Sequence, residues 1–416
     1  MMQPRAATRS DPSSACGGSP GLLSFFTSLP GVSAAIQTIT TFNIASVTQL
    51  LDAAGYLPLL LSAESRRLGD VFEVRGEPRR FEIAAEAHGP GRLDGRNRTG
   101  GPAASLRFLW RPVPEDYVGD PGSALAVPPL PLLPEVSQRI EVFDWELRFH
   151  GGTAGYRAYG MGRTLPGGGV AFVLDVLEGF GELAGLAGTV VASGGIAPNG
   201  ALELAVVTRV MDPAGGPLTM LPLSPLPPGA GAEPGVTYLA FLGQVDPSHP
   251  VTLRLSLTEG ILGSWVYEML RAATLDFDAG ADGRLRGGAR AGAVVGSVSA
   301  RLSFDPLSLC ALSPIQTRCG VFEFHDPAGR SLGTLYSDMI EGRSFRTGLE
   351  GVLLPVFRFG GFGPIAGGTG EFAGARGIMT MNSVISVQPR TLANLYVLRL
   401  DDPDGRYRAV LGGGLA

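Results

Sequence analysis

A glycine-rich motif that occurs twice places the strongest constraint on how this chain folds. The copies read GFGELAGLAG at 179–188 and GTGEFAGARG at 368–377, and six of their ten residues are identical at a distance of 189 positions. Each copy then runs through a strand-like stretch to an Asp-Pro pair, at 212–213 and 402–403. Self-similarity at a fixed distance is typical of a repeated structural unit. The sequence therefore predicts two copies of one domain.

Two weaker landmarks repeat in the same order before the motif. Phe149-His150 and Phe324-His325 each precede a turn sequence rich in glycine or proline. Residues 46–54 resemble residues 264–273, and in both stretches a serine is followed by apolar residues at helical spacing. A serine N-cap with apolar positions at i, i+3, i+4 and i+7 predicts a short amphipathic helix. We expect one such helix in each copy.

Outside these helices, the chain alternates short β-rich stretches with glycine turns. Strands of this length and spacing favour an antiparallel barrel or sandwich over β-α-β units. The predicted fold class is all-β, with two tandem antiparallel β-barrels. The expected strands are 81–85, 105–110, 141–149, 169–176, 202–210, 294–304, 321–325, 352–359, 378–387 and 395–400.

Proline and glycine mark the expected domain boundaries. The 416 residues include 33 Pro and 61 Gly, yet 44% are hydrophobic, and a disordered chain does not carry that apolar content. The glycines therefore belong to turns of a packed structure. We expect a disordered N-terminal tail at 1–19, a first barrel at 20–213 with a proline-rich insertion at 112–134, a proline-rich linker at 214–234, a second barrel at 235–408 and a C-terminal tail at 409–416.

The charged residues exclude several function classes. All 33 basic residues are arginine, so chemistry that needs a lysine amine, such as Schiff-base formation or a Walker A loop, is excluded. The formal net charge is −5 and no long arginine run occurs, which argues against nucleic-acid binding. The exclusive use of arginine is typical of a genome of high GC content.

Cysteine and histidine are too sparse to predict a disulfide framework or a metal site. The three cysteines lack CxxC spacing, and the four histidines lie far apart. The sequence also has no good signal peptide and no run of 18 apolar residues. We therefore expect a cytoplasmic protein of a reducing compartment, without a membrane span, a metal ion or an organic cofactor.

The second glycine motif, GGTGEFAGARG at 367–377, resembles the signature of dirigent proteins and allene oxide cyclases. This resemblance covers about a dozen residues, and the first copy has Ala187 where the second has Arg376. The resemblance implies an eight-stranded antiparallel barrel with an apolar cavity open at one end. It also implies cofactor-free steering of a cyclisation or coupling.

Five residues of the second copy are candidate catalytic groups. Period-two alternation places Glu323 and His325 on one face of a strand, and Tyr336 and Asp338 on one face of the next. If these faces point inward, they provide acid and base groups inside an apolar cavity. Arg376 is added because the corresponding arginine of the resembled family is associated with the cavity. The alternative is that all five face solvent or brace neighbouring charges.

Three functions follow from this pattern. The first is a cofactor-independent isomerase or cyclase acting on an apolar small molecule, which suits natural-product biosynthesis. The second is a non-catalytic carrier of a hydrophobic ligand. The third is a scaffold in which the two barrels pack as an intramolecular pseudo-dimer, with a homo-oligomer left open.

Overall fold

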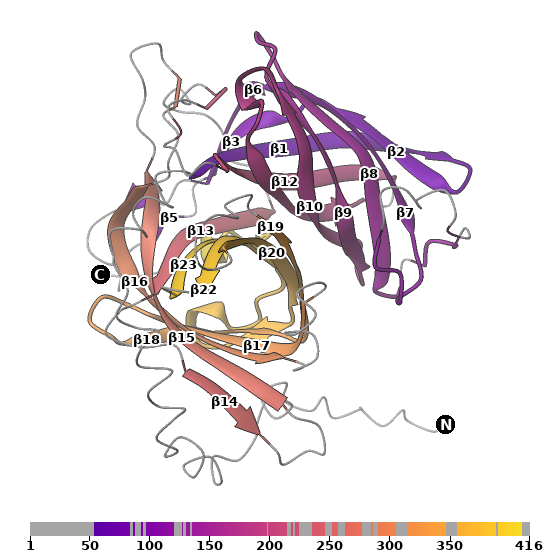
Figure 1. Cartoon of the computed structure of the whole chain (residues 1–416). Coiled ribbons are helices and arrows are strands. Elements are labelled where there is room, and N and C mark those ends of the chain that lie inside the picture. Colours follow the sequence, from indigo (N-terminus) through magenta and orange to yellow (C-terminus); the bar gives the residue numbers. More distant parts are fainter. Residues whose placement is uncertain are drawn as a thin grey trace, which may run out of the picture.

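The computed structural model describes an all-β protein made of two large sheets (Figure 1). No α-helix occurs among the described residues, and none of their helices is long and apolar enough to cross a membrane. The described residues are 54–83, 86–87, 93–94, 97–119, 127, 130–133, 135–197, 199–213, 218, 221–223, 235–245, 252–256, 263–276, 284–285, 290–304, 315–346, 356–387 and 390–409.

The first sheet and a separate small hairpin are formed by residues 54–211. The ten strands of the sheet are β1 (Ala54–Leu68), β2 (Val71–Gly76), β3 (Arg79–Ile83), β6 (Asn97–Pro102), β7 (Ala104–Pro112), β8 (Gln138–Phe149), β9 (Gly155–Leu165), β10 (Gly169–Phe180), β11 (Ala187–Ile196) and β12 (Ala201–Met211). The hairpin pairs β4 (Glu86–Ala87) with β5 (Leu93–Asp94), and the 3-10 helix η2 (Gly181–Leu183) lies within the first glycine motif.

The second sheet is formed by residues 236–401. Its strands are β13 (Val236–Val245), β14 (Thr252–Ser256), β15 (Gly263–Asp276), β16 (Arg290–Phe304), β17 (Ile315–His325), β18 (Ser331–Ser337), β19 (Ile340–Arg346), β20 (Val356–Ile365), β21 (Gly367–Gly368), β22 (Gly377–Val387) and β23 (Arg390–Asp401). Two 3-10 helices accompany them, η3 (Gly370–Phe372) within the second glycine motif and η4 (Arg406–Ala409) after β23.

Eight strands of the first sheet close into an antiparallel barrel. The ladder order is β12-β11-β10-β9-β8-β7-β2-β1, and β1 pairs in turn with β12 from Ala54 opposite Met211 to Glu64 opposite Ala201. Closure leaves none of these eight strands with an unpaired edge, which removes a hazard of open sheets.

The interior of this barrel is a packed apolar core. Alternate residues of β7 point inward, among them Leu106, Phe108 and Trp110, because strand side chains alternate between the two faces. Phe108 stacks on Trp145 at 4.9 Å between ring centroids, and Phe172 completes the aromatic cluster. The interior therefore holds side chains, as expected for a barrel of this strand number.

Residues outside the barrel strands close one of its ends. Leu221 and Leu223 are fully buried in the barrel core, and they exchange backbone hydrogen bonds with Leu285. Arg284 beside it forms an ion pair with Glu182 of η2. Two leucines of the expected proline-rich linker at 214–234 are therefore buried in the barrel, where a linker is expected to lie on the surface. The expected open apolar mouth is also absent at this end.

The second sheet curls around its own apolar core. Antiparallel ladders join β15, β13, β23, β22, β20, β19 and β17 in that order, and β16 pairs with both β15 and β17. The core contains the inward side chains of β17, Phe322 and Phe324, together with Phe372 of the glycine motif. Phe324 and Phe372 lie 4.8 Å apart between ring centroids. The motif phenylalanine thus anchors its turn in the core.

The predicted amphipathic helices are not present among the described residues. Residues 264–273 lie within β15, which pairs with β13 and β14 along one edge and with β16 along the other. The aromatic and β-branched residues Trp265, Val266 and Tyr267 favour a strand, and Leu270 and Ala272 alternate into the core. Of the first predicted helix, residues 46–53 lie outside the described residues, and Ala54 begins β1.

The cysteine prediction also needs correction. Cys319 on β17 is disulfide-bonded, with its partner outside the described residues. A low and odd cysteine count excludes a framework of several disulfides, but it does not exclude one bond. Because disulfides persist mainly in oxidising compartments, the cysteine count no longer supports a reducing compartment.

Candidate functional site between the two sheets

The two sheets pack against each other through their outer faces. Strands β10 and β11 of the barrel contact β20 and β22 of the second sheet. Leu165, Val173 and Val191 pack there with Phe362 and Ile378. A second apolar cluster joins Phe81 to Tyr238, whose rings meet edge to face at 5.0 Å. We call this contact region the seam.

Polar side chains of the second sheet also bind backbone atoms of the barrel across the seam. The Asn382 amide donates hydrogen bonds to the carbonyls of Thr189, at 2.9 Å, and Val207, at 3.2 Å. Arg358 donates to the carbonyl of Gly188 and forms an ion pair with Asp175 at 2.8 Å. Burial raises the pKa of the Asp175 carboxyl, and the Arg358 charge opposes that rise. These contacts fix the relative position of the sheets.

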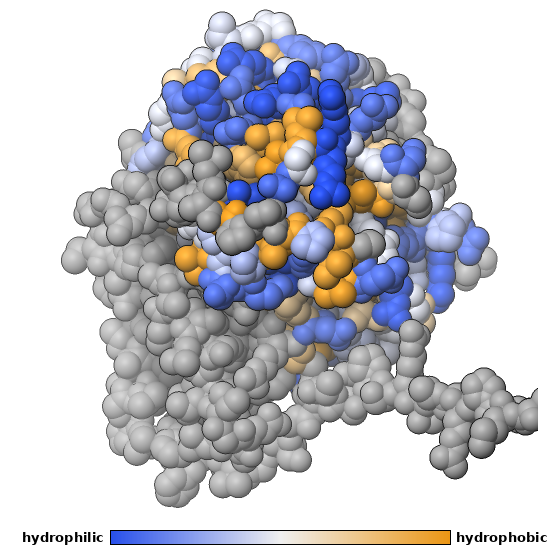
Figure 2. Space-filling view, turned by 90° about the vertical axis from the view of Figure 1, so that its right-hand side faces the viewer, coloured by the Kyte–Doolittle hydropathy of each residue, from blue (hydrophilic) through white to orange (hydrophobic). Residues whose placement is uncertain are grey.

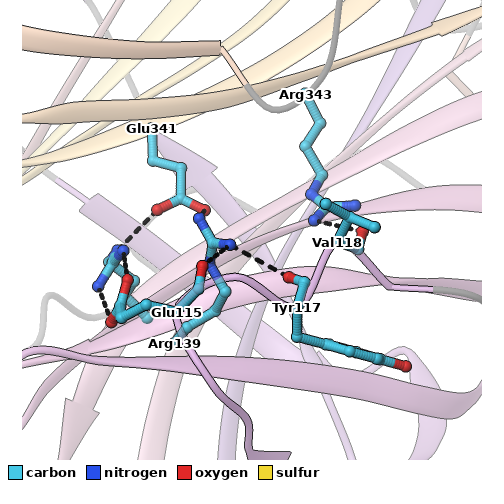
Figure 3. A network of polar contacts seen from close by, with 7 residues as sticks. Glu115, Tyr117, Val118, Arg139, Glu341 and Arg343 are labelled. Atoms are coloured by element: carbon cyan, nitrogen blue, oxygen red, sulfur yellow. Dashed lines mark hydrogen bonds and ion pairs between the residues drawn. The ribbon is translucent and has the colours of Figure 1, made fainter. Parts of the chain in front are cut away.

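An arginine cluster lies at one part of the seam (Figure 3). Buried Glu341 of β19 accepts from Arg163 at 2.6 Å and from Arg139 at 3.5 Å, so a carboxylate of one sheet binds two cations of the other. Arg163 also donates two hydrogen bonds to the carboxylate of Glu115. These hydrogen bonds lower the pKa of the Glu115 carboxyl. Arg343 adds a third buried cation.

A second buried carboxylate lies within the barrel half of this region. Glu141 is completely buried and accepts from Arg111 at 2.9 Å, Tyr117 at 2.9 Å and Tyr159 at 2.6 Å. Burial and the Glu141 carboxylate both raise the pKa of the Tyr159 hydroxyl. The segment after β7 is held to the barrel through these contacts.

A groove of about 840 Å³ opens elsewhere along the seam, with walls from both sheets. Glycine backbone forms much of the barrel wall, at 167–169 and 194–195, and apolar residues such as Leu165, Ile365 and Ile378 add to the lining. The volume lies within the range of small-molecule sites in proteins. Apolar walls with few charged groups are also typical of such sites.

Five charged residues line the groove, namely Glu203, Asp338, Arg376, Arg399 and Asp401. Arg399 pairs with Asp401 at 3.1 Å, while its buried Nε makes no hydrogen bond. Its guanidinium lies over Gly195, where a Cβ would come within 3.7 Å of the Nη2 atom. The side chain of Arg376 is exposed on the groove wall, and its carbonyl accepts from the amide of Asp401.

The structure places the five predicted site residues in three different surroundings. Arg376 and Asp338 both line the groove, although neither points into a barrel interior. Tyr336, on β18, is half-buried and does not line the groove. The expectation that these side chains converge inside a barrel is wrong, because Leu335 takes the inward position and Tyr336 the opposite face.

Glu323 and His325 lie at the end of β17, on the face opposite the buried Phe322 and Phe324. Ser331 donates to Glu323 at 2.8 Å, and the His325 Nε2 lies 3.6 Å from the same carboxylate oxygen. The acid therefore contacts both the hydroxyl and the imidazole. These residues form a group at a hairpin end, apart from the groove lining.

The sequence pattern assigns no role to Arg399 and does not distinguish the buried arginines from solvent-facing ones. Tyr396 and Arg399 have opposite parity on β23, and the structure buries Tyr396 in the second core while Arg399 faces the groove. Arg139, Arg163 and Arg343 all lie on alternating strands, where an arginine is usually read as solvent-facing. Only a contact between distant strands makes them buried.

The outer face of the barrel away from the seam carries alternating charges. Glu146 binds Arg148 and Arg157, and Arg157 binds Glu178, all on exposed side chains. Asp144, Glu146, Arg148 and His150 share this face. Figure 2 shows a face of the molecule on which apolar and hydrophilic residues are interspersed. The exposed large hydrophobic residues of the described chain are Leu68, Val118, Leu133, Val136, Leu177 and Val294.

Comparison with known proteins adds little to this geometry. No family model matches the chain, and no curated protein matches it. Among solved structures, a protein of unknown function from the DUF3598 family of Nostoc punctiforme is 10% identical, covering 86% of this chain and all of that one with a TM-score of 0.14. A transferrin binding protein B variant from Haemophilus parasuis is 7% identical, covering 82% and 76% with a TM-score of 0.12. Neither likeness carries an argument about fold or function.

Proposed function

We propose that this chain is a tandem duplication of one β-barrel and that it binds a small amphipathic molecule in the groove between the two copies. The groove carries this proposal, since it combines apolar walls, glycine backbone, the exposed Arg376 and an Arg399 whose buried Nε makes no hydrogen bond. A ligand with an apolar body and one carboxylate or other oxyanion fits this chemistry.

Strand order and register support the duplication. In both sheets a glycine motif with a 3-10 helix lies between the paired strands, β10 and β11 in one and β20 and β22 in the other. Each sheet also has a ladder that places a tyrosine opposite an arginine. Tyr56 lies opposite Arg209 between β1 and β12, and Tyr238 lies opposite Arg399 between β13 and β23. The Phe-His pairs fall at the ends of β8 and β17.

The filled barrel interiors argue for a site in the seam. Among the described residues, both cores are occupied by aromatic and aliphatic side chains, and residues 221–223 and 285 close one end of the first barrel. The groove offers both volume and charged groups. We therefore propose that the ligand expected from the resemblance binds at the seam and not in a barrel interior.

Arg376 is the group best placed to bind the anionic end of the ligand. Its side chain is exposed on the groove wall and makes no ion pair with a described residue. A guanidinium can hold a carboxylate through two parallel hydrogen bonds and stays charged at all physiological pH values. Charge-assisted hydrogen bonds contribute roughly 1.5–3 kcal/mol, which corresponds to about a tenfold or larger change in affinity.

Titration with a fluorescent long-chain fatty acid, such as cis-parinaric acid, tests this role. We expect saturable binding to the wild-type protein and at least about tenfold weaker binding to Arg376→Ala. Arg330→Ala is the matched control, because Arg330 is exposed and pairs with Asp326 away from the groove. Equal affinity of all three proteins would contradict the assignment of Arg376.

The second candidate function is a cofactor-free isomerase or cyclase, favoured by the presence of Asp338 in the same groove as Arg376. Asp338 would transfer a proton while Arg376 holds an oxygen of the substrate. Incubation with a reactive unsaturated fatty acid epoxide, followed by chiral chromatography, tests for turnover. Catalysis predicts that Asp338→Asn keeps probe binding and loses product formation. A carrier predicts the same product mixture with and without the protein.

A further inference from the structure

Arg343 differs from the other arginines of the seam cluster because it has no carboxylate partner among its described contacts. It is only 8% exposed, and its one hydrogen bond runs from Nη2 to the carbonyl of Val118 at 3.1 Å. Its buried Nε makes no hydrogen bond. Glu341, two residues earlier on β19, already accepts from Arg163 and Arg139. A buried cation normally has a counter-charge, because its desolvation is costly.

The ladder register identifies Arg163 as the counterpart of Arg343. Arg163 lies opposite Ala171 in the barrel, and Arg343 lies opposite Gly360 in the second sheet. Ala171 and Gly360 are 189 positions apart, the same distance that separates the two glycine motifs. The same backbone position therefore carries an arginine in both halves, with different surroundings.

The difference arises at the position two residues before each arginine. Glu341 lies opposite Phe362, and its counterpart Met161 lies opposite Val173, again 189 positions apart. Glu341 serves Arg163 across the seam, together with Glu115. Met161 is an apolar, buried residue, so the reciprocal carboxylate for Arg343 is missing. Burial lowers the pKa of the Arg343 guanidinium to about 10, although the nearby Glu341 carboxylate opposes this fall.

Polar groups and solvent both lie close to Arg343. Val118, whose carbonyl it binds, is 63% exposed, so a small solute can approach the segment that covers the guanidinium. Arg139, which binds the carbonyls of Glu115 and Tyr117 in the same segment, also has a buried Nε without a hydrogen bond (Figure 3). Two guanidinium groups with unused donors, one from β8 and one from β19, thus bind the same segment, residues 115–118.

We propose that Arg343, with Arg139 beside it, forms a second binding site, which takes a small oxyanion such as a carboxylate or a phosphate group. The anion supplies the charge that Glu341 supplies to Arg163. A planar guanidinium fork binds both groups in a bidentate manner, whereas chloride offers no such geometry. This site uses different residues from the groove, so the proposed anion site does not depend on whether the groove binds the proposed ligand.

Thermal unfolding in increasing inorganic phosphate tests the site, with sodium chloride at matched ionic strength as reference. A ligand that binds only the folded state raises the Tm in a saturable manner. We expect this rise for the wild type and for the control Arg330→Ala, whose exposed side chain lies away from both sites, and no rise for Arg343→Met. Repeating the series with acetate shows whether a carboxylate or a phosphate is preferred. A phosphate-dependent rise that persists in Arg343→Met would overturn the proposal.

Met161→Glu provides a sharper test, because it introduces the missing carboxylate within the chain. We expect this variant to lose at least tenfold in phosphate affinity by isothermal titration calorimetry, while the Met161→Gln control keeps it. Asp120→Asn is a further control, since Asp120 follows this segment in the sequence. If Met161→Glu fails to fold, Arg343→Met decides the question. Unchanged phosphate affinity in a folded Met161→Glu protein would contradict the site.

Discussion

The interior of the first barrel and the seam between the sheets are both buried, yet they are built from opposite chemistry. The barrel interior is aliphatic and aromatic, with Trp145, Phe108 and Phe172 at its centre. The seam contains buried Arg139, Glu341 and other charged side chains. Apolar packing is tolerant of exchange between similar side chains, whereas buried charges require particular partners. The comparison indicates that apolar packing in the interior provides most of the stability and that the polar contacts of the seam fix how the two sheets pack.

The largest expected effect is the loss of an aromatic side chain from the barrel interior. Trp145→Ala should lower the free energy of unfolding by about 3–5 kcal/mol, because it removes buried contacts and leaves a cavity. Urea denaturation followed by circular dichroism measures this change. The exposed control Leu177→Ala should stay within about 0.5 kcal/mol of the wild type. Similar losses for both variants would contradict the assignment of the interior as the main core.

Removing the central carboxylate of the seam should have a somewhat smaller effect. Glu341→Gln leaves Arg139 and Arg163 without their shared negative charge, and breaking a buried ion pair costs about 3 kcal/mol or more. Arg163 keeps Glu115, so we expect the lower end of that range. The measurement is again urea denaturation, with the exposed Glu178→Gln as control. If Glu341→Gln had the same free energy of unfolding as the wild type, the seam charges would not act as partners.

Asn382→Ala probes the uncharged part of the seam. The substitution leaves the carbonyls of Thr189 and Val207 without the amide that donates to them. An unsatisfied buried polar group costs about 1–3 kcal/mol, so the expected destabilisation is of that order. Asn394→Ala is a useful comparison, because the Asn394 amide binds Tyr396 within the second sheet and not across the seam. Separation of the unfolding transitions of the two halves in Asn382→Ala alone would sharpen the comparison.

The smallest expected effect concerns pH. Hydrogen bonds to Arg163 hold the pKa of Glu115 below its ordinary value, so this carboxylate contributes stability above that value and loses it as the pH falls through the folded-state pKa. Glu115→Gln should therefore reduce the loss of unfolding free energy on acidification, and with it the fall of the Tm. The reduction should be about 1 kcal/mol or less, because the Glu115 side chain is 61% exposed. Tm measurements between pH 7 and about pH 3 test this, and identical profiles would contradict it.

The sequence predicts the all-β fold well where strands alternate visibly. The expected stretches 105–110, 141–149 and 202–210 lie within β7, β8 and β12. β9 was missed because Gly160 and Gly162 resemble turn residues. In the structure these glycines allow close approach of β10, since a Cβ would lie 2.1 Å from the carbonyl oxygens of Val173 and Ala171, respectively.

The functional region is harder to predict, because it depends on how two distant parts of the chain pack. Arg376 and Asp338 could be singled out from the motif and from strand alternation, and they share the groove. Nothing local to Arg343 or Glu341 distinguishes them from solvent-facing residues of a strand. Their burial comes from contact with residues about 180–200 positions earlier, such as Arg139 and Arg163. Sequence periodicity carries no information about such a contact.

Photo-crosslinking with a fatty acid that carries a diazirine in its chain tests most directly whether the seam, and not a barrel interior, binds the ligand. Peptide mapping by mass spectrometry should place the label on groove residues from both sheets, such as Leu202, Ile365 and Ile378. Labelling should be lost in Gly195→Trp, because Gly195 lines the groove and a Cβ there meets Arg399 and Gly168 only at ordinary van der Waals distance, so an indole would occupy groove volume. Labels on core residues such as Phe108 or Phe322, unaffected by Gly195→Trp, would contradict the account.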